Sequence, residues 1–175
     1  MTAPEFSRPV RIDTIGEGPR RLGVEAEEVE RINLARRFGL VSIDRLAADL
    51  TLSRKGSDVA MAGILSAKVV QACVATGEPI EAAIEAPFDL VFRPQVEPAG
   101  PEDEIELGEN ELDVIFYDSS AIDVGEAVAE TLLLNLDPYP RAPGAEAALR
   151  EAGVKSEEEA APLGALAGLG DLLKK

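Results

Sequence analysis

Between residues 80 and 92 every even-numbered position is apolar, and this alternation constrains the fold more than any other feature of the sequence. Glu81, Glu85 and Asp89 lie at odd-numbered positions in between. Because successive side chains of a β-strand point to opposite faces of a sheet, the pattern predicts a strand with one buried and one solvated face. Pro87 cannot donate a hydrogen bond to a neighbouring strand, so we expect an edge position or a bulge there.

Two segments before this one alternate in the same way. We predict strands at Ile43–Thr51 and Val59–Val70, in addition to Ile80–Arg93, with short turns at residues 55–58 and 75–79. Turns of this length favour antiparallel pairing of the three strands. Shorter alternating segments predict two further strands, at Phe6–Asp13 and around residues 112–116, where Leu112, Val114 and Phe116 share one face.

Two helices are expected to accompany the sheet. The first is predicted at Ala26–Phe38, with Val29, Ile32 and Ala35 on one side, and Gly39 is a plausible C-terminal stop. The second is predicted at residues 124–136, before Pro138.

The beginning of the second helix carries a capping signal. Asp123 and Glu126 are three residues apart, directly before and within the apolar run, which is the spacing of a capping box. In that motif the first side chain accepts a hydrogen bond from the helix backbone and the second reaches back to the first residue.

These elements predict the domain organisation. We expect one α+β domain over residues 1–140, in which an antiparallel sheet, either open or barrel-like, packs against the two main helices. Residues 141–175 are rich in Ala, Gly and Glu and are expected to form a flexible, weakly ordered tail.

Composition excludes several classes of chemistry. The chain has no His and a single Cys, Cys73, which rules out a His-containing catalytic triad, a His-ligated metal and an internal disulfide. We expect Cys73 to be a small buried residue without a metal, and we expect no cofactor. No apolar run approaches the roughly 18 residues of a membrane span, so a cytoplasmic protein without a membrane span is expected.

Negative charge is concentrated in one part of the chain. The net charge is −16, and residues 95–140 contain 13 acidic residues but no Lys or Arg. Such a charge opposes direct RNA binding and suits a docking surface for a basic protein partner. The alternative is a solvated acidic loop and helix face without a partner. The partner-binding residues predicted on this basis are Glu102, Asp103, Glu104, Asp118, Asp123, Glu126, Glu130 and Asp137.

Three segments carry a resemblance to a known family. The residues CVATGEPI at 73–80, FDL at 88–90 and DSSAIDVGEAVAETLLLNLDPYP at 118–140 resemble the YceD family of large ribosomal RNA subunit accumulation proteins, in particular its alphaproteobacterial branch. The resemblance covers about residues 5–145. The positions that match the family motif are Cys73, Glu78, Pro79, Asp123, Glu126, Pro138 and Pro140. Thr76 stands where members usually have a second Cys, so the thiolate metal site possible in other members is not available here.

The resemblance implies a role in the accumulation or processing of large-subunit ribosomal RNA. Together with the charge, it predicts a non-enzymatic assembly factor that docks a basic partner, such as a large-subunit ribosomal protein. Two alternatives stay open. One is a Mg²⁺-dependent hydrolase of precursor RNA that uses Asp and Glu, and the other is a binding module for another basic or lipid-synthesis partner.

Overall fold

Three long strands form the centre of the fold in the computed structural model, which describes residues 4–95 and 113–154. They are β3 (Ser42–Lys55), β4 (Asp58–Ala72) and β5 (Pro79–Pro94), and they pair in antiparallel fashion. The three predicted strands are therefore confirmed, and each is longer than expected. The remaining elements are β1 (Pro9–Arg11), a 3-10 turn (Ile12–Thr14), β2 (Arg20–Glu25), α1 (Glu28–Phe38), β6 (Val114–Tyr117), β7 (Ala121–Asp123), α2 (Val124–Leu134) and α3 (Ala145–Glu151).

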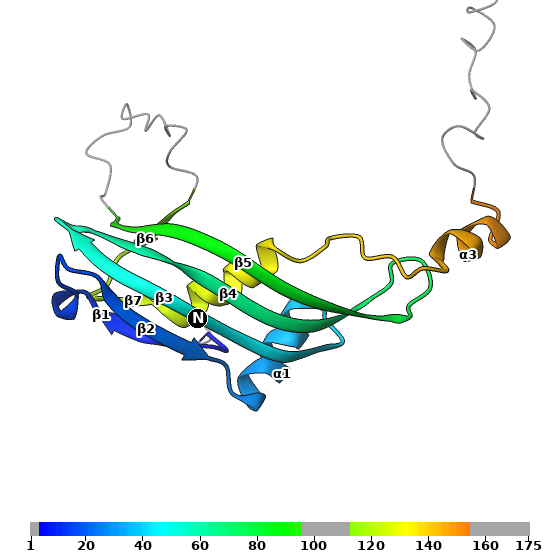
Figure 1. The fold of residues 1–175 in the computed structure, drawn as a ribbon, viewed down its shortest axis with the longest axis horizontal. Coiled ribbons are helices and arrows are strands. Elements are labelled where there is room, and N and C mark those ends of the chain that lie inside the picture. The colour runs from blue at the N-terminus through cyan, green and yellow to red at the C-terminus, as the bar shows by residue number, and fades with distance from the viewer. Residues whose placement is uncertain (1–3, 96–112, 155–175) are drawn as a thin grey trace, which may run out of the picture.

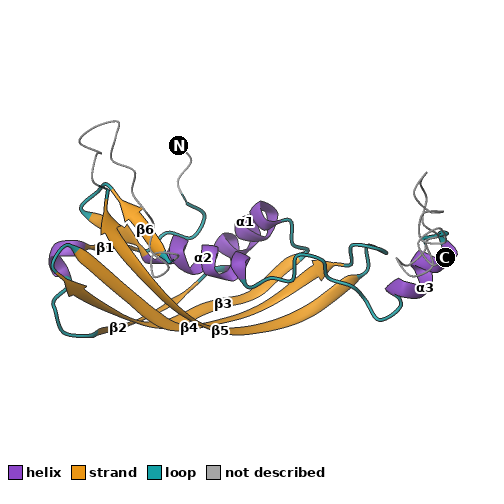
Figure 2. Ribbon diagram, turned by 90° about the horizontal axis from the view of Figure 1, so that it is seen from above, coloured by secondary structure: helices purple, strands orange, loops and turns teal. Residues whose placement is uncertain are grey.

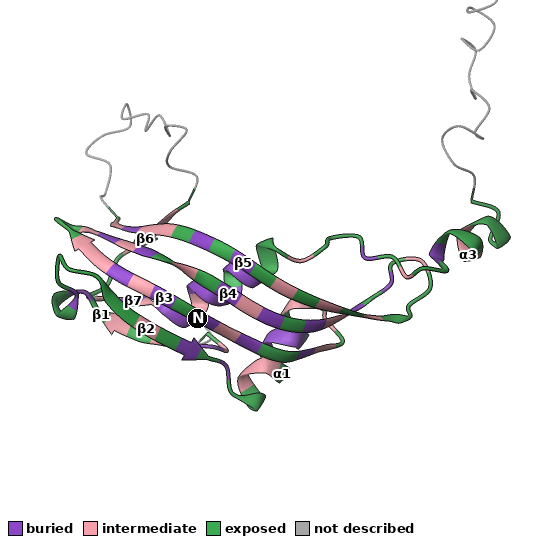
Figure 3. Ribbon diagram, viewed as in Figure 1, coloured by how far each residue is buried: buried purple, intermediate pink, exposed green. Residues whose placement is uncertain are grey.

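The register brings the apolar positions of the three strands onto one face. Leu46 of β3 lies opposite Ala67 of β4, which lies opposite Ile84 of β5. The even-numbered positions of β5 from 80 to 92 are all buried or half-buried, whereas its odd-numbered positions from 81 to 89 are all exposed. The period-2 prediction is thus confirmed, and Figure 3 shows the alternation along each strand.

The sheet curves, and both main helices lie on its concave face (Figure 2). Helix α1 contacts β3 and helix α2 contacts β4. The core lies between the helices and the sheet. Burial of the apolar side chains of this core is the main favourable contribution to folding. Its fully buried members include Phe6, Leu34, Leu46, Leu52, Met61, Leu65, Ile122, Val128 and Leu132.

The sheet is open rather than barrel-like, and its pairing is antiparallel as predicted except for one parallel pair. The strand order is β2-β3-β4-β5-β6, so the edge strands β2 and β6 lie at opposite ends (Figure 1). Strand β6 pairs with β5 in parallel, because the chain returns through a long connection rather than a tight turn. Strand β2 was not predicted.

The face that β6 turns toward the core also differs from the expectation. Val114 and Phe116 were expected to form the apolar face, but Phe116 is 52% exposed while Ile115 and Tyr117 pack against the core. The strand expected at Phe6–Asp13 is shorter, because only β1 is extended and Ile12 begins a 3-10 turn.

Of the three residues predicted to form the apolar side of helix α1, only Ala35 is buried. Leu34 and Ala35 are buried as its core contacts, whereas Val29 is 68% and Ile32 is 52% exposed. The predicted stop is confirmed, because Gly39 ends the helix with φ +67°, a conformation that costs glycine little.

The N-terminal segment lies across the beginning of α2. β1 pairs with β7 in antiparallel fashion, with Pro9 opposite Asp123. A side chain at Gly125 would come within 2.4 Å of the backbone oxygen of Phe6, so glycine permits this close approach. Helix α2 ends at Leu134, two residues before the predicted end.

The first part of the predicted tail contains structure. Residues 145–151 form α3, and Val74 donates a backbone hydrogen bond of 2.9 Å to Pro140 just before this part begins. The rest of the tail, residues 155–175, lies outside the described residues.

Candidate functional site

Four of the predicted docking residues meet around one cavity beside α2. Asp118, Asp123, Glu126 and Glu130 line a cavity of about 230 Å³ between β6, β7 and α2. Apolar side chains, among them Phe92 and those of β6, form the rest of its wall. Apolar walls with several carboxylates at the rim are suited to a side chain that is apolar along its length and cationic at its end, as Lys and Arg are.

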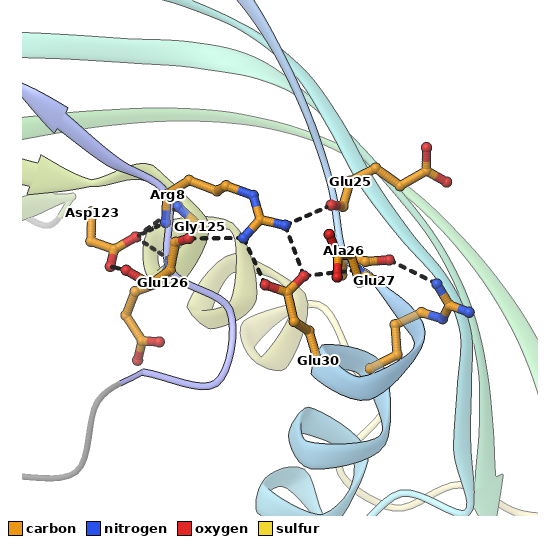
Figure 4. A network of polar contacts seen from close by, with 10 residues as sticks. Arg8, Glu25, Ala26, Glu27, Glu30, Asp123, Gly125 and Glu126 are labelled. Carbon is orange, nitrogen blue, oxygen red and sulfur yellow. Dashed lines mark hydrogen bonds and ion pairs between the residues drawn. The ribbon is translucent and has the colours of Figure 1, made fainter.

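Asp123 is occupied by contacts within the chain. Its Oδ1 accepts hydrogen bonds from the backbone N–H groups of Gly125 (3.1 Å), Glu126 (3.2 Å) and Arg8 (2.8 Å), and Ser7 Oγ donates to its Oδ2. The predicted helix cap is therefore confirmed. The same carboxylate also fastens the N-terminal segment to α2 (Figure 4).

Glu126 does not complete the predicted capping box. Its carboxylate pairs with Arg37 of α1 instead, at 2.7 Å and 3.1 Å, and the same guanidinium contacts Glu5 at 3.0 Å. These two carboxylates raise the pKa of Arg37, with the Glu126 hydrogen bond as the main cause. Arg37 thus joins α1, α2 and the N-terminal segment.

A second ion pair joins the N-terminal segment to α1. Arg8 donates from Nη1 and Nη2 to the two oxygens of Glu30, at 2.6 Å and 2.8 Å (Figure 4). Glu30 also accepts a hydrogen bond from the backbone of Glu27, which closes a capping box at the beginning of α1. The Arg8 hydrogen bond is the main reason that the pKa of Glu30 lies below its ordinary value.

Glu130 differs from Glu126, one helical turn before it. Partial burial is the main cause that raises the pKa of Glu130, the nearby Glu126 carboxylate raises it further, and Arg37 acts in the opposite direction. Among the six ion pairs found within residues 4–95 and 113–154, none involves Glu130 or Asp118. These two acids are therefore the members of the cavity that remain available to a partner.

Asp137 lies apart from the cavity, beside a second one of about 320 Å³ between the ends of α1, β4 and α2. Its carboxylate accepts a hydrogen bond from Tyr139 N, and its backbone oxygen accepts one from the buried Gln71 side chain. Glu102, Asp103 and Glu104 lie outside the described residues, so the structure does not place them.

The other motif positions form a joint between the β4–β5 turn and the segment after α2. Within the turn, Cys73 donates from its backbone to Glu78, directly before Pro79. Pro140 accepts the backbone hydrogen bond of Val74, while Pro138 and Pro140 line the second cavity. These contacts show that the motif residues connect the β4–β5 turn to the segment after α2.

Cys73 is 3% exposed, in agreement with the prediction that it is buried. Ala142 N donates to its Sγ at 3.3 Å. This hydrogen bond and a second from Thr76 are the main causes that lower the pKa of the thiol to about 7. Within the part of the chain that the structure describes, no group of three or more Cys, Asp or Glu side chains is arranged to hold a metal ion.

The sequence did not indicate the basic members of this region. Arg8 and Arg37 have partners 22 to 115 residues away in the chain, and no local spacing signals such pairs. The one local hint was the position of Arg37 in the last turn of α1, which indicates a favourable contact with the helix dipole rather than a partner.

Comparison with known proteins gives one match. The model of the family described as large ribosomal RNA subunit accumulation protein YceD matches residues 61–173. Comparisons with curated proteins and with solved structures give no match. No helix among the described residues is long and apolar enough to cross a membrane. The matched region covers more than half of the chain, from β4 through α2 and beyond, and the protein therefore belongs to the YceD family.

Proposed function

We propose that this protein is a non-enzymatic factor that supports the accumulation and processing of large-subunit ribosomal RNA by docking a basic protein partner. The family description supports a role in ribosome biogenesis. A role in ribosome assembly implies a cytoplasmic protein.

One observation carries the docking part of the proposal. Asp118 and Glu130 remain without an ion pair among the described residues, at the rim of a cavity whose other walls are largely apolar. Asp137, which is also exposed, adds a third acid on the segment after α2, apart from the cavity. We call these three residues the helix-side acids. A cationic side chain that entered the cavity would gain apolar contact along its stem and charge pairing at its end.

The net charge of the protein supports a basic class of partner. With a net charge of −16, the protein repels the phosphate backbone of RNA, whereas ribosomal proteins are strongly cationic. A large-subunit ribosomal protein therefore fits the proposed role better than the RNA itself.

The test is a quantitative pull-down from cell lysate with the full-length chain as bait. We expect basic large-subunit ribosomal proteins to be enriched, and we expect Asp118→Asn, Glu130→Gln and Asp137→Asn together to reduce that enrichment at least fivefold. The matched control removes three exposed acids elsewhere, by Glu17→Gln, Glu28→Gln and Glu146→Gln, and keeps the same net charge. Equal recovery by both variants would reject the docking face, and no enrichment by the unchanged protein would reject the partner class.

A further inference from the structure

One edge of the sheet is largely unpaired. Strand β5 pairs with β4 along nearly all of its length, from Pro79 to Phe92, but it pairs with β6 only over residues 91–94. Within the part of the chain that the structure describes, no strand pairs with residues 79–90 on this second side (Figure 1). An unpaired edge of this length is a template for another strand.

The backbone groups of the odd-numbered residues point toward this edge. Val91 N donates to Asp113 O at 2.9 Å and Gln95 N donates to Tyr117 O at 2.8 Å, both on the β6 side. Because alternate residues of a strand direct their N–H and C=O groups to the same side, residues 81–89 at odd positions present theirs to the unpaired edge. Pro87 occupies one of these positions, so its missing N–H removes no hydrogen bond to β4.

The side chains along the edge carry one sign of charge. Glu81, Glu85 and Asp89 are exposed and lie four residues apart. Because they alternate with the buried and half-buried even-numbered positions, they lie on the face of the strand opposite the core. We call these three residues the acidic edge. None of the six ion pairs found in residues 4–95 and 113–154 involves them. A second copy of this chain paired along the same edge would set carboxylates against carboxylates, which is unfavourable.

The concave face of the same segment is apolar and only partly covered. Ile80, Ala82 and Ile84 are half-buried, and Ala82 and Ile84 pack against the core. A strand added to the edge would extend this surface with every second side chain. A partner strand that complements this edge therefore has cationic residues on one face, four positions apart in its sequence, and apolar residues on the other face.

We propose that the edge of β5 at residues 80–90 binds an extended cationic segment of a partner protein as an additional strand. Main-chain hydrogen bonds to the odd-numbered residues supply the pairing, and Lys or Arg opposite the acidic edge supplies the selectivity. The parallel addition of β6 to the end of the same edge is an intramolecular example of this pairing. The inference shares with the proposed function the basic character of the partner, but it concerns a surface distinct from the helix-side acids.

The first experiment measures the affinity of the full-length chain for a fluorescent peptide built from the repeat Lys-Val-Ser-Val. We expect saturable binding that weakens as salt rises, because screening reduces the charge pairing. The peptide with Glu in place of Lys should not bind. Changing Glu81→Gln, Glu85→Gln and Asp89→Asn together should weaken binding at least tenfold. The matched control is the variant Glu17→Gln, Glu28→Gln and Glu146→Gln, which removes equal charge from exposed positions elsewhere and should change affinity less than twofold.

The second experiment separates strand addition from simple charge attraction. Glu85→Gln and Glu85→Pro remove the same charge, but only the proline also removes an N–H from the free edge. Pairing with β4 is retained, because that N–H points away from β4. We expect the proline variant to bind the peptide at least fivefold more weakly than the glutamine variant, with unchanged circular dichroism.

Each opposite outcome overturns the inference. Equal affinities of the proline and glutamine variants would show that the peptide binds by charge alone. Equal loss of affinity in the acidic-edge variant and in the control variant would place the peptide elsewhere. Protection of the N–H groups of residues 81–89 from hydrogen exchange in a peptide-free dimer would make a second copy the occupant. A failed pull-down with intact peptide binding would reject the proposed function and leave this inference standing.

Discussion

The beginning of α2 and the acidic edge of β5 are both rich in carboxylates, but they use them differently. At the beginning of α2, Asp123 accepts hydrogen bonds from three backbone N–H groups, and Glu126 is paired with Arg37. On β5, the three carboxylates of the acidic edge are exposed and take part in none of the ion pairs found in residues 4–95 and 113–154.

The difference teaches that an excess of acidic residues does not by itself locate a docking surface. Carboxylates at a junction of segments form bonds within the chain, so their removal should lower the free energy of unfolding. Carboxylates that form no ion pair within the fold are free to pair with cations of a partner, so their removal should weaken the affinity for the partner instead. The predictions below test this division.

The largest effect on stability is expected at Asp123. Asp123→Ala removes a helix cap that contributes about 1 kcal/mol and leaves the Arg8 N–H without its acceptor, for a total loss of about 2–3 kcal/mol. Urea unfolding followed by circular dichroism measures this free energy. Asp118→Ala is the control, because this neighbouring acid is exposed and should change stability by less than about 0.5 kcal/mol. Similar losses of unfolding free energy in Asp123→Ala and Asp118→Ala would contradict the division between acids bonded within the fold and acids free for a partner.

The next effect concerns Glu30 and depends on pH. Its pKa in the folded protein lies below the ordinary value of 4.5, mainly because of Arg8. The stabilisation is therefore present above pH 4.5 and is lost as pH falls through the folded pKa. Glu30→Gln should cost about 1–2 kcal/mol at pH 7 and much less at pH 3.

Unfolding curves of the unchanged protein and the Glu30→Gln variant at the two pH values test this. Glu28→Gln serves as control, since Glu28 is an exposed acid of the same helix. A penalty that is equal at both pH values would mean that the Arg8–Glu30 pair does not depend on the charge of the carboxylate.

A smaller contrast is expected within α2 itself. Glu126→Gln should reduce stability by about 1 kcal/mol, because it weakens the partly buried pair with Arg37. Glu130→Gln should cause no loss, because burial and Glu126 raise the pKa of Glu130 and disfavour its charged form. A raised folded pKa makes the ionised group unfavourable as pH rises above 4.5, so any gain from this variant should appear at pH 7 and vanish at pH 3. The midpoint temperatures of thermal unfolding at pH 7 and pH 3 measure the stability of both variants.

The smallest effect on stability is expected at the acidic edge. Neutralising its three carboxylates should change the unfolding free energy by less than about 0.5 kcal/mol, because each is exposed and unpaired among the described residues. The same variant should lose peptide binding, so stability and affinity change independently. A substantial loss of stability would show that these acids serve the fold as Asp123 does.

The helix α1 illustrates why part of the structure escaped prediction. Its length and its stop at Gly39 follow from the sequence, but its buried side does not. Glu30, Leu34 and Arg37 form one stripe that faces the N-terminal segment and α2, through the Arg8 and Glu126 ion pairs. Because these partners are distant in the chain, the apolar Val29 and Ile32 suggested the wrong side.

The candidate docking residues show the same division. The prediction grouped eight acids by their place in one acidic stretch, and the structure gathers Asp118, Asp123, Glu126 and Glu130 around one cavity. It also assigns two of the four to intramolecular bonds, which charge counting does not reveal. The acids of β5 were read as the solvated face of a strand, and their possible role emerged from the unpaired edge beside them.

The sequence by itself determined the features that depend on near neighbours. The alternation of β3, β4 and β5, the turn between each pair and the cap at Asp123 all follow from side-chain periodicity and local hydrogen bonding. Tertiary structure alone decided the parallel position of β6, the open sheet and the ion pairs of Arg8 and Arg37. These features join segments that are far apart in the chain, and their energies arise only when folding has brought those segments together.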